Sequence, residues 1–455
     1  MLYAYLGCLQ IYIAIFNFKL FCKLTLFVKK RTSYMNKKPI MLVALLCVLP
    51  VFNALANVSA SENILTLKQA LSNTEQQNPI LKRYPYHQKI LSALKSQATL
   101  SPNPVLSVAV ENVLGTNDAR GVKGAEITLG LSQLIELGDK RQSRVGFATA
   151  NIKAQAIQYQ NTRLALLATT AERYYSALKF QTLLALNVER KSVVTQALKT
   201  IEQRANAGAV SQADVSRMRY ALSQVELEQV KLTSEFERAR LLLNELWIDE
   251  QSSAFLAGNI NVITPLKSQQ ALLDAVNLAP EFALLQQQYI QQTANLALQK
   301  ANGQSDINVG GGVRYNQKND SSSLLFSFSM PLQISNANSG NIAAAASELA
   351  LLNQQQGQLR VQLRQQVRTL YAYYQGIANQ ATLLNKQIIP QTQTLIEQSL
   401  NSYQRGQISV LQLLDAQQAH FDSKRALIAT HAELYQVLLT LERLTGQSLI
   451  ETYQS

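Results

Sequence analysis

The chain changes its hydrophobic period abruptly, from two residues to a helical repeat, directly after a pair of alternating segments. Apolar residues alternate with small or polar ones over 104–112 and again over 125–137, with turn-forming residues between the two runs. Alternation over this length predicts a β-hairpin at 104–137. The following segment, 139–206, has no proline and a single glycine, Gly146, which predicts a helix of roughly 100 Å. A hairpin that leads directly into so long a helix is unusual in a compact domain.

The same pattern returns about 197 residues later. Alternation over 306–315 and 323–334 predicts a second hairpin, 306–334, and a second long helix begins near 338. Leu131 then matches Phe328, and Gly208 matches Gly406. An internal repeat of this length predicts duplicated architecture. We therefore expect a leader at 1–56, a first repeat at 57–248 with long helices 139–206 and 211–246, a linker at 249–267, and a second repeat at 268–455 with long helices 338–404 and 409–445.

Each hairpin has strands of about ten residues with one apolar face, which is typical of a membrane β-barrel wall. The alternative is an amphipathic hairpin packed on a soluble core. Four strands cannot close a barrel, and open sheet edges are not tolerated in lipid, so several copies of the chain must share one barrel. Thr128, Gly130, Ser327 and Ser329 are expected to face the lumen. The residues expected to face lipid are Ile127, Leu129, Leu131, Phe326, Phe328 and Met330.

The amino-terminal 56 residues contain seven Lys or Arg and no acidic residue. Residues 35–56 are typical of a secretory signal, with a basic start, an apolar core and an Ala54-Leu-Ala56 cleavage site. Residues 1–34 precede this complete signal, so we interpret them as an over-extended start; a membrane anchor is the alternative. Without the leader the net charge falls from +13 to +6, and all three cysteines are lost. No apolar run of about twenty residues follows, so no membrane helix is expected in the mature chain.

The long helices carry apolar residues at heptad spacing, for example Ile157, Leu164, Ala171 and Leu178, which favours coiled-coil packing. Each long helix should end in a sharp turn at a glycine, Gly208 or Gly406, because glycine adopts the left-handed conformation readily. Ser211 and Ser409 are then placed to cap the next helix. Pro390 should break the second long helix locally.

The mature chain offers no chemistry of its own. Its histidines, His87, His420 and His431, are scattered, and no His, Cys or Met cluster has metal-ligand spacing. There is no phosphate-binding loop and no nucleophile motif. We expect no catalytic, cofactor or metal site and no nucleic-acid partner.

The turn segments carry a family resemblance. Residues 406–416, preceded by Tyr403 and by 388–391, resemble the TolC family of outer-membrane efflux proteins. Residues 103–104, 111–112, Gln133, and 136–141 with Arg144 look like its CzcC-like, heavy-metal branch. That branch often has a second glycine where this chain has Asp139. The resemblance covers about residues 62–447.

The resemblance implies a fold that is mainly α-helical and an assembly that is a trimer. Each chain would give four transmembrane strands to a shared twelve-stranded barrel and a long antiparallel coiled coil to an α-helical tunnel. The protein would lie in the cell outer membrane with the helical barrel in the periplasm. It would be the passive exit duct of a tripartite efflux pump for heavy-metal cations, with a periplasmic adaptor and an inner-membrane RND-type transporter as partners.

The resemblance also implies a gate at the periplasmic tip, formed by Asp214, Gln412 and Asp415. The chain departs from the familiar pattern here, because Ile408 stands where an arginine would pair with the first aspartate. Another base, such as Arg217 or Arg405, would have to form that tie. The turns at Gly208, Ser211, Gly406 and Ser409 would be the adaptor-docking tip. The alternative for Asp214 and Asp415 is that they are solvated residues in the first turns of their helices, where carboxylates favour the helix dipole.

Other functions fit the same sequence less well. Within this fold, the alternative is a drug-efflux duct or a type I secretion duct. A structural periplasmic coiled-coil protein is a further alternative, which would lack barrel strands. An enzyme is the least favoured class, for want of any site.

Overall fold

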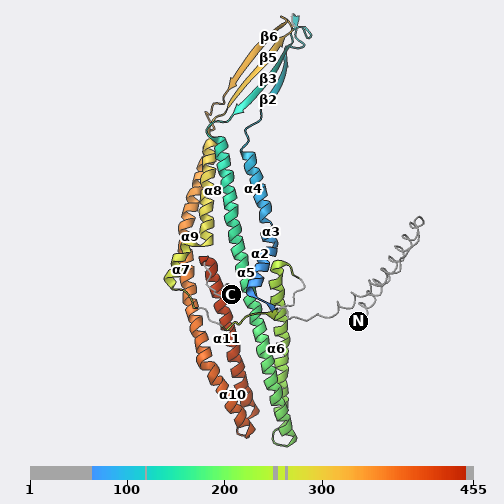
Figure 1. Cartoon of the computed structure of the whole chain (residues 1–455), viewed down its shortest axis with the longest axis vertical. Helices are drawn as coiled ribbons and strands as arrows, with labels where there is room; N and C mark the ends of the chain where they lie inside the picture. The colour runs from blue at the N-terminus through green and yellow to red at the C-terminus, as the bar shows by residue number, and fades with distance from the viewer. Residues whose placement is uncertain (1–63, 118–119, 250–254, 262–264, 447–455) are drawn as a thin grey trace, which may run out of the picture. The chain divides into compact units, whose positions relative to one another are not determined.

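The computed structural model describes residues 64–117, 120–249, 255–261 and 265–446 (Figure 1). The elements described here belong to one compact unit, Glu62–Ser455. The expected leader, 1–56, with its signal segment lies outside the described residues.

The elements follow one another in the order that the repeat predicts. The first half contains α2 (Leu67–Gln77), α3 (Pro79–Lys82), α4 (Tyr84–Ala98), β2 (Val105–Glu111), β3 (Glu126–Ile135), α5 (Lys140–Asn206) and α6 (Gln212–Asn244). The second half contains α7 (Gln269–Ala275), α8 (Pro280–Asn302), β5 (Ile307–Asn316), β6 (Ser321–Ser329), α9 (Ser339–Leu383), α10 (Ile389–Gln404) and α11 (Val410–Thr445). Two short 3-10 turns, Glu245–Trp247 and Val276–Leu278, follow α6 and α7.

The two hairpins join in one antiparallel sheet with the order β2-β3-β5-β6 (Figure 1). The central pairing, between β3 and β5, connects the two halves; for example, Leu129 is opposite Val313. The second hairpin is shorter than expected, because β6 ends at Ser329 and Met330 lies beyond the strand. Pro331 explains this end, since proline has no N–H to continue the ladder.

The long helices extend away from the sheet (Figure 1). The helix α5 is continuous through Val193, whereas its counterpart is interrupted by a π-helical turn, Leu384–Ile388, just before Pro390. The local break predicted at Pro390 is thus present in one half alone. Among the described residues, none of the helices is both long and apolar enough to cross a membrane.

A two-stranded parallel sheet was missed by the sequence analysis. The strand β1 (Ile64–Leu65) pairs with β4 (Phe255–Leu256), which lies within the segment expected to be an irregular linker. The Gln181 side chain binds both backbone groups of Leu256, at 2.8 and 2.9 Å. The Tyr174 hydroxyl donates to the Leu65 carbonyl at 2.9 Å, and burial raises the pKa of this phenol to about 12. Two side chains of α5 therefore fix this small sheet.

Two apolar cores hold the helices together. The larger core joins α5, α6, α9 and α11 at the level of β1 and β4, and includes a stack of Tyr175 on Tyr435 with ring centroids 4.0 Å apart. The smaller core lies near the helical turns and includes Ile201, Met218 and Tyr403. The heptad prediction is correct for Ala171 and Leu178, which are buried, but Leu164 is exposed in the single chain.

Candidate functional site: the sheet faces and the helical tip

One face of the four-stranded sheet is apolar and exposed. The register sets Val108, Leu129, Val313 and Leu324 side by side in one cross-strand row. Phe326, two residues further along β6, is 87% exposed. A large exposed apolar surface indicates contact with a partner or a membrane. The predicted lipid-facing residues that lie within strands share this face; they are Ile127, Leu129, Leu131, Phe326 and Phe328. Their contact with lipid stays a prediction.

The opposite face is lined mainly by small residues. Gly130 is directly opposite Ser107 on this face, and a Cβ at Gly130 would lie 2.8 Å from the Ser107 hydroxyl oxygen. A Cβ at Gly312 would lie 2.7 Å from the Leu129 carbonyl oxygen. Larger side chains at these two positions would collide with the neighbouring strand. The residues predicted to face the lumen, Thr128, Gly130, Ser327 and Ser329, all lie on this face.

Arg314 is a large exception on the small-residue face, and the sequence analysis did not single it out. Its guanidinium bonds to Glu111 at 3.0 Å and to Glu126 at 3.2 Å, and donates to the Thr128 hydroxyl at 3.0 Å. These partners lie on β2 and β3, while Arg314 lies on β5. The side chain therefore bridges the two hairpins.

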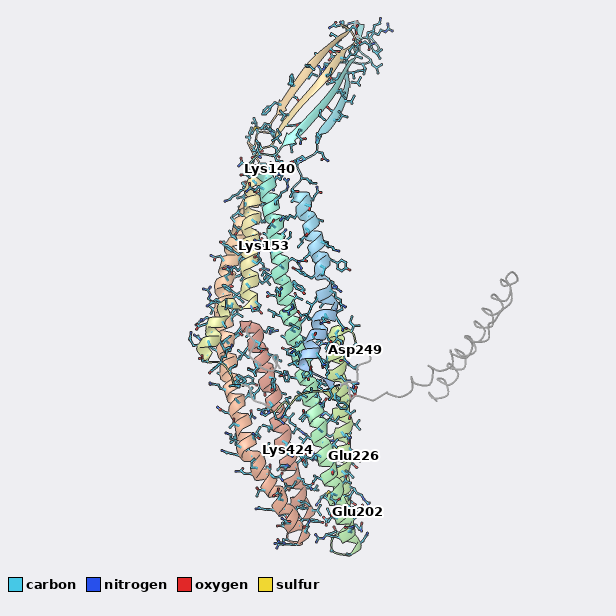
Figure 2. All side chains as sticks on the ribbon, viewed as in Figure 1. Lys140, Lys153, Glu202, Glu226, Asp249 and Lys424 are labelled. Carbon is cyan, nitrogen blue, oxygen red and sulfur yellow. The ribbon has the colours of Figure 1, made fainter. Side chains whose placement is uncertain are left out.

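The sheet meets α5 through ion pairs. Lys140, labelled in Figure 2 at the start of α5, contacts Asp306 at 2.7 Å. Asp306 also accepts from the backbone N–H of Leu137 at 3.1 Å. Arg144 forms a two-pronged pair with Glu136. Bidentate pairs restrain geometry as well as charge, so they fix the direction in which the helix leaves the sheet.

The far ends of the helices turn at the two predicted glycines. Gly208 has φ +74° and Gly406 has φ +75°, the left-handed region that favours glycine. Ser211 and Ser409 are the N-caps of α6 and α11, as expected, and each forms a capping box with the residue three positions on. The two turns are thus built alike.

The three residues expected at the gate have local roles in the single chain. The Ser211 hydroxyl donates to Asp214 at 2.8 Å, and the Ser409 N–H donates to Gln412 at 2.9 Å, so both side chains complete capping boxes. Asp415 is exposed on α11. Within the described ranges of the single chain, no basic side chain forms an ion pair with Asp214 or Asp415. The tie through Arg217 or Arg405 stays a prediction.

Another arginine connects the two tip hairpins. Arg204 of α5 donates to the backbone carbonyl of Tyr403 at 2.6 Å, and its guanidinium lies over the Tyr403 ring at 4.9 Å. Glu202, labelled nearby in Figure 2, pairs with Arg219 of α6 within its own hairpin. The internal repeat could have indicated the contact between Arg204 and Tyr403. It sets these two residues at almost equivalent positions, about one helical turn before Gly208 and Gly406.

The two histidines of α11 are packed. His420 contacts the Thr392 hydroxyl at 3.3 Å and His431 contacts the Asn261 side-chain oxygen at 3.2 Å. Burial lowers the pKa of both imidazoles. In the part of the chain that the structure describes, no group of three His, Cys, Asp or Glu side chains could hold a metal ion.

This combination of an amphipathic sheet and a long helical hairpin pair has known relatives. Residues 87–247 match the family model described as outer membrane efflux protein. The chain thus contains an outer membrane efflux protein domain over these residues. The cobalt-zinc-cadmium resistance protein CzcC of Cupriavidus metallidurans is 21% identical over 352 residues, which cover 77% of this chain and 82% of the relative.

Solved structures share the fold. The CusC structure, described in terms of transmembrane channel formation, matches with a TM-score of 0.69 and 16% identity, covering 83% of this chain and 91% of CusC. The outer membrane protein VceC of Vibrio cholerae matches with a TM-score of 0.66 and 16% identity, covering 84% of this chain and 97% of VceC.

The expected resemblance to outer membrane efflux proteins and the expected mainly α-helical fold with some strands are thereby confirmed. The chain is an outer membrane efflux channel component, and the matched family consists of transport ducts rather than enzymes. The outer membrane location predicted from the resemblance follows from the same assignment.

Proposed function

We propose that three copies of the chain form a passive exit duct for heavy-metal cations. The observation that carries this proposal is the sheet with two open edges and one exposed apolar face. The edges are β2 and β6, and among the residues that the structure describes each has one side without a strand partner. Unpaired backbone groups are costly in lipid, so β6 of one copy should pair with β2 of the next. Three copies then give the twelve strands that the family resemblance implies.

The helices next to the open edges support the same arrangement. The helix α4 leads into β2 and exposes an apolar stripe of Tyr86, Ile90 and Leu94. The helix α9 follows β6 and exposes Leu351 and Val361. The helix α4 lies next to the β2 edge and α9 lies next to the β6 edge. If β2 pairs with the neighbour's β6, α4 should therefore lie beside the neighbour's α9. Apolar stripes on both helices would then be buried by the same head-to-tail contact.

The cargo and the partners are proposed from the relatives. CzcC is named for cobalt, zinc and cadmium resistance, and this chain covers most of its length. The chain would receive cations from an inner-membrane RND-type transporter and a periplasmic adaptor, and release them outside. Since the described residues contain no cluster suited to hold a metal, cargo selection would reside in the partners.

The helical turns are the proposed tip. Gly208, Ser211, Gly406 and Ser409 would form the adaptor-docking end, and the ring of Asp214, Gln412 and Asp415 would form the constriction. The Arg204 contact with Tyr403 supports a modified tie between the hairpins in place of the missing arginine at Ile408. The carboxylates of Asp415, repeated by three copies, would favour cations.

The cargo is tested by deleting the gene and measuring sensitivity to cobalt, zinc, cadmium, copper and a panel of drugs. Sensitivity to metals alone, restored by the intact gene, is the expected outcome. Sensitivity to drugs alone would favour the drug-efflux alternative, and a defect in export of a protein would favour a type I secretion duct.

The trimer is tested separately by disulfide cross-linking, because the chain has no cysteine beyond Cys47. Each variant carries two cysteines, one in β2 at or near Val108 and one in β6 at or near Leu324. Cross-linked dimers and trimers between β2 and β6 are expected in outer-membrane fractions. Monomers for every pair would contradict the shared barrel.

A further inference from the structure

The small-residue face of the sheet carries charge at one level only. Along the four strands as the structure describes them, the charged side chains on this face are Glu111, Glu126 and Arg314. Two carboxylates against one guanidinium leave one net negative charge per chain. The remaining residues of this face are uncharged, so any electrostatic preference of the face depends on this cluster.

Arg314 fixes the cluster with its whole guanidinium group. Its Nε donates to the Thr128 hydroxyl at 3.0 Å, and its two terminal nitrogens lie 3.2 Å from Glu126 and 3.0 Å from Glu111. Glu126 also accepts from the Asn316 amide at 2.8 Å, and its side chain is 19% exposed. The Glu111 side chain is 50% exposed. The carboxylate that keeps most contact with solvent is therefore Glu111.

The cluster lies at the end of the sheet away from the long helices. Glu111 is the last residue of β2 and Glu126 is the first of β3, whereas α5 follows the other end of β3. With the helices in the periplasm, this end is the outer mouth of the proposed barrel. Two basic residues of the connecting segment, Arg120 and Lys123, lie beyond the strand ends and not on the small-residue face.

We propose that Glu111 makes the outer mouth of the duct favour cations over anions, with Arg314 as its positioning residue. The proposal rests on the shared barrel proposed above, in which the small-residue face lines the lumen. Three copies then repeat the net negative charge around the mouth, and a ring of carboxylates favours cations. The charges act through the local potential, which decays over about 10 Å at 0.1 M salt. This ring is separate from the one proposed at Asp415, at the opposite end of the duct.

The test measures the local potential with a single cysteine, Ala109→Cys, in outer-membrane fractions that contain the full-length protein. Ala109 is exposed on the same face of β2 and lies two residues from Glu111, roughly 7 Å along the strand. The rates of modification by a cationic and an anionic methanethiosulfonate, carrying trimethylammonium and sulfonate groups, are compared. Because both reagents need the thiolate, the ratio of the two rates cancels any change in thiol ionisation.

The ratio of the cationic to the anionic rate should follow the charge of the cluster. Glu111→Gln should lower this ratio about two- to fourfold at 0.1 M salt, since a single charge about 7 Å away acts oppositely on the two reagents. Arg314→Gln should raise the ratio by a similar factor. The double variant, Glu111→Gln with Arg314→Gln, keeps the net charge and should return near the natural value. A purely structural ion pair would not produce opposite shifts that cancel.

The matched control is Asp320→Asn, which removes a carboxylate at the same end of the sheet. Asp320 accepts from the Tyr315 hydroxyl at 2.9 Å, and Tyr315 lies on the apolar face. The ratio at Ala109→Cys should stay at its natural value in this variant. An equal fall in Asp320→Asn and Glu111→Gln would show a general surface charge and overturn the role of Glu111.

The decisive variant is Glu111→Gln, because a half-exposed carboxylate at a strand end can be lost without preventing assembly. An unchanged ratio in this variant would mean that the cluster only bridges the hairpins. That result leaves the proposed barrel standing if Ala109→Cys reacts while Val108→Cys, on the apolar face, is protected by lipid. Reaction of Val108→Cys alone would reverse the two faces and overturn the proposed barrel together with this inference.

Discussion

Arg204 and Tyr403 connect the two helical hairpins at their tips, through a hydrogen bond of 2.6 Å to the Tyr403 carbonyl and a guanidinium 4.9 Å above its ring. The two residues are 199 positions apart in the chain. Their contact is a specific candidate for the element that holds the tip closed.

Arg204→Gln should loosen this contact. The loss of a charge-assisted hydrogen bond and a cation–π contact amounts to about 1–2 kcal/mol, which shifts a two-state tip roughly tenfold toward the open form. Single-channel conductance in planar bilayers would measure the open probability. Arg217→Gln, at an exposed position on α6, is the control and should behave as the natural chain. An unchanged open probability in Arg204→Gln would exclude this tie.

Arg substitutions on the two sheet faces should differ in effect. Leu129→Arg or Phe328→Arg places a charge on the face proposed to contact lipid, at a cost of roughly 2–4 kcal/mol per chain near the bilayer midplane. Ser327→Arg, on the small-residue face, should be milder. The yield of SDS-resistant trimers in outer-membrane fractions measures assembly. Equal yields for the three variants would contradict the assignment of the faces.

Gly406→Val should disturb the tip and leave the sheet intact. At φ +75° a β-branched residue is strained, although an added Cβ would make only an ordinary contact, 3.7 Å from an Arg204 guanidinium nitrogen. Trimers should still form, while adaptor cross-linking and export should fall. Gly357→Ala, in the middle of α9 with nothing near the added methyl group, is the control and should be neutral or slightly stabilising. Normal export by Gly406→Val would argue against docking at this turn.

Asp415→Asn should reduce cation selectivity. In the proposed trimer, three Asp415 carboxylates form a ring that attracts cations. Reversal potentials in a salt gradient and block by divalent ions measure the effect. Asp422→Asn, about two turns further along α11, is the matched control. Selectivity and block that match the natural channel would mean that Asp415 does not line the constriction.

Stability should fall below about pH 6.5, because burial lowers the pKa of His431 and of His420 below the ordinary value of 6.5. The unfolded chain then binds protons that the folded chain does not, so acidification favours unfolding by up to about 1.4 kcal/mol per pH unit and per histidine. Thermal unfolding from pH 7.5 to 5 measures this slope. His431→Gln should make this slope shallower than in the natural chain. An unchanged slope in His431→Gln would show that His431 does not contribute.

The elements that carry a local pattern were predicted well from the sequence. The hairpins and long helices lie within a few residues of their expected ends, because strand alternation and the left-handed glycines are properties of adjacent residues. Met330 was predicted to lie in a strand because it continues the alternation of apolar residues along β6. Pro331 ends the strand earlier, because it cannot donate a backbone hydrogen bond to the neighbouring strand. The pair β1–β4 has two residues per strand, too few for any period to appear.

The specific side-chain contacts were much less accessible to prediction. Asp214 and Gln412 were expected at a gate, and in the single chain they cap their own helices. The contacts of Arg204 and Arg314 depend on which distant elements come together, and long side chains have many possible partners. A sequence pattern predicts the face of an element, but it does not predict the partner across that face.

The β1–β4 pair has a consequence for the order of folding. About 190 residues separate Ile64 from Phe255, so this parallel pair closes a loop that contains the whole first half of the chain. The entropy of closing so long a loop is lost before the contact forms, which delays non-local pairs. The strand β1, at the amino-terminal end of the described unit, should therefore pair with β4 only late in folding. The first hairpin and α5 must form first, because Gln181 of α5 holds Leu256. Pulse-labelled hydrogen exchange should find the Ala257 amide, which donates to Leu65, among the last to be protected.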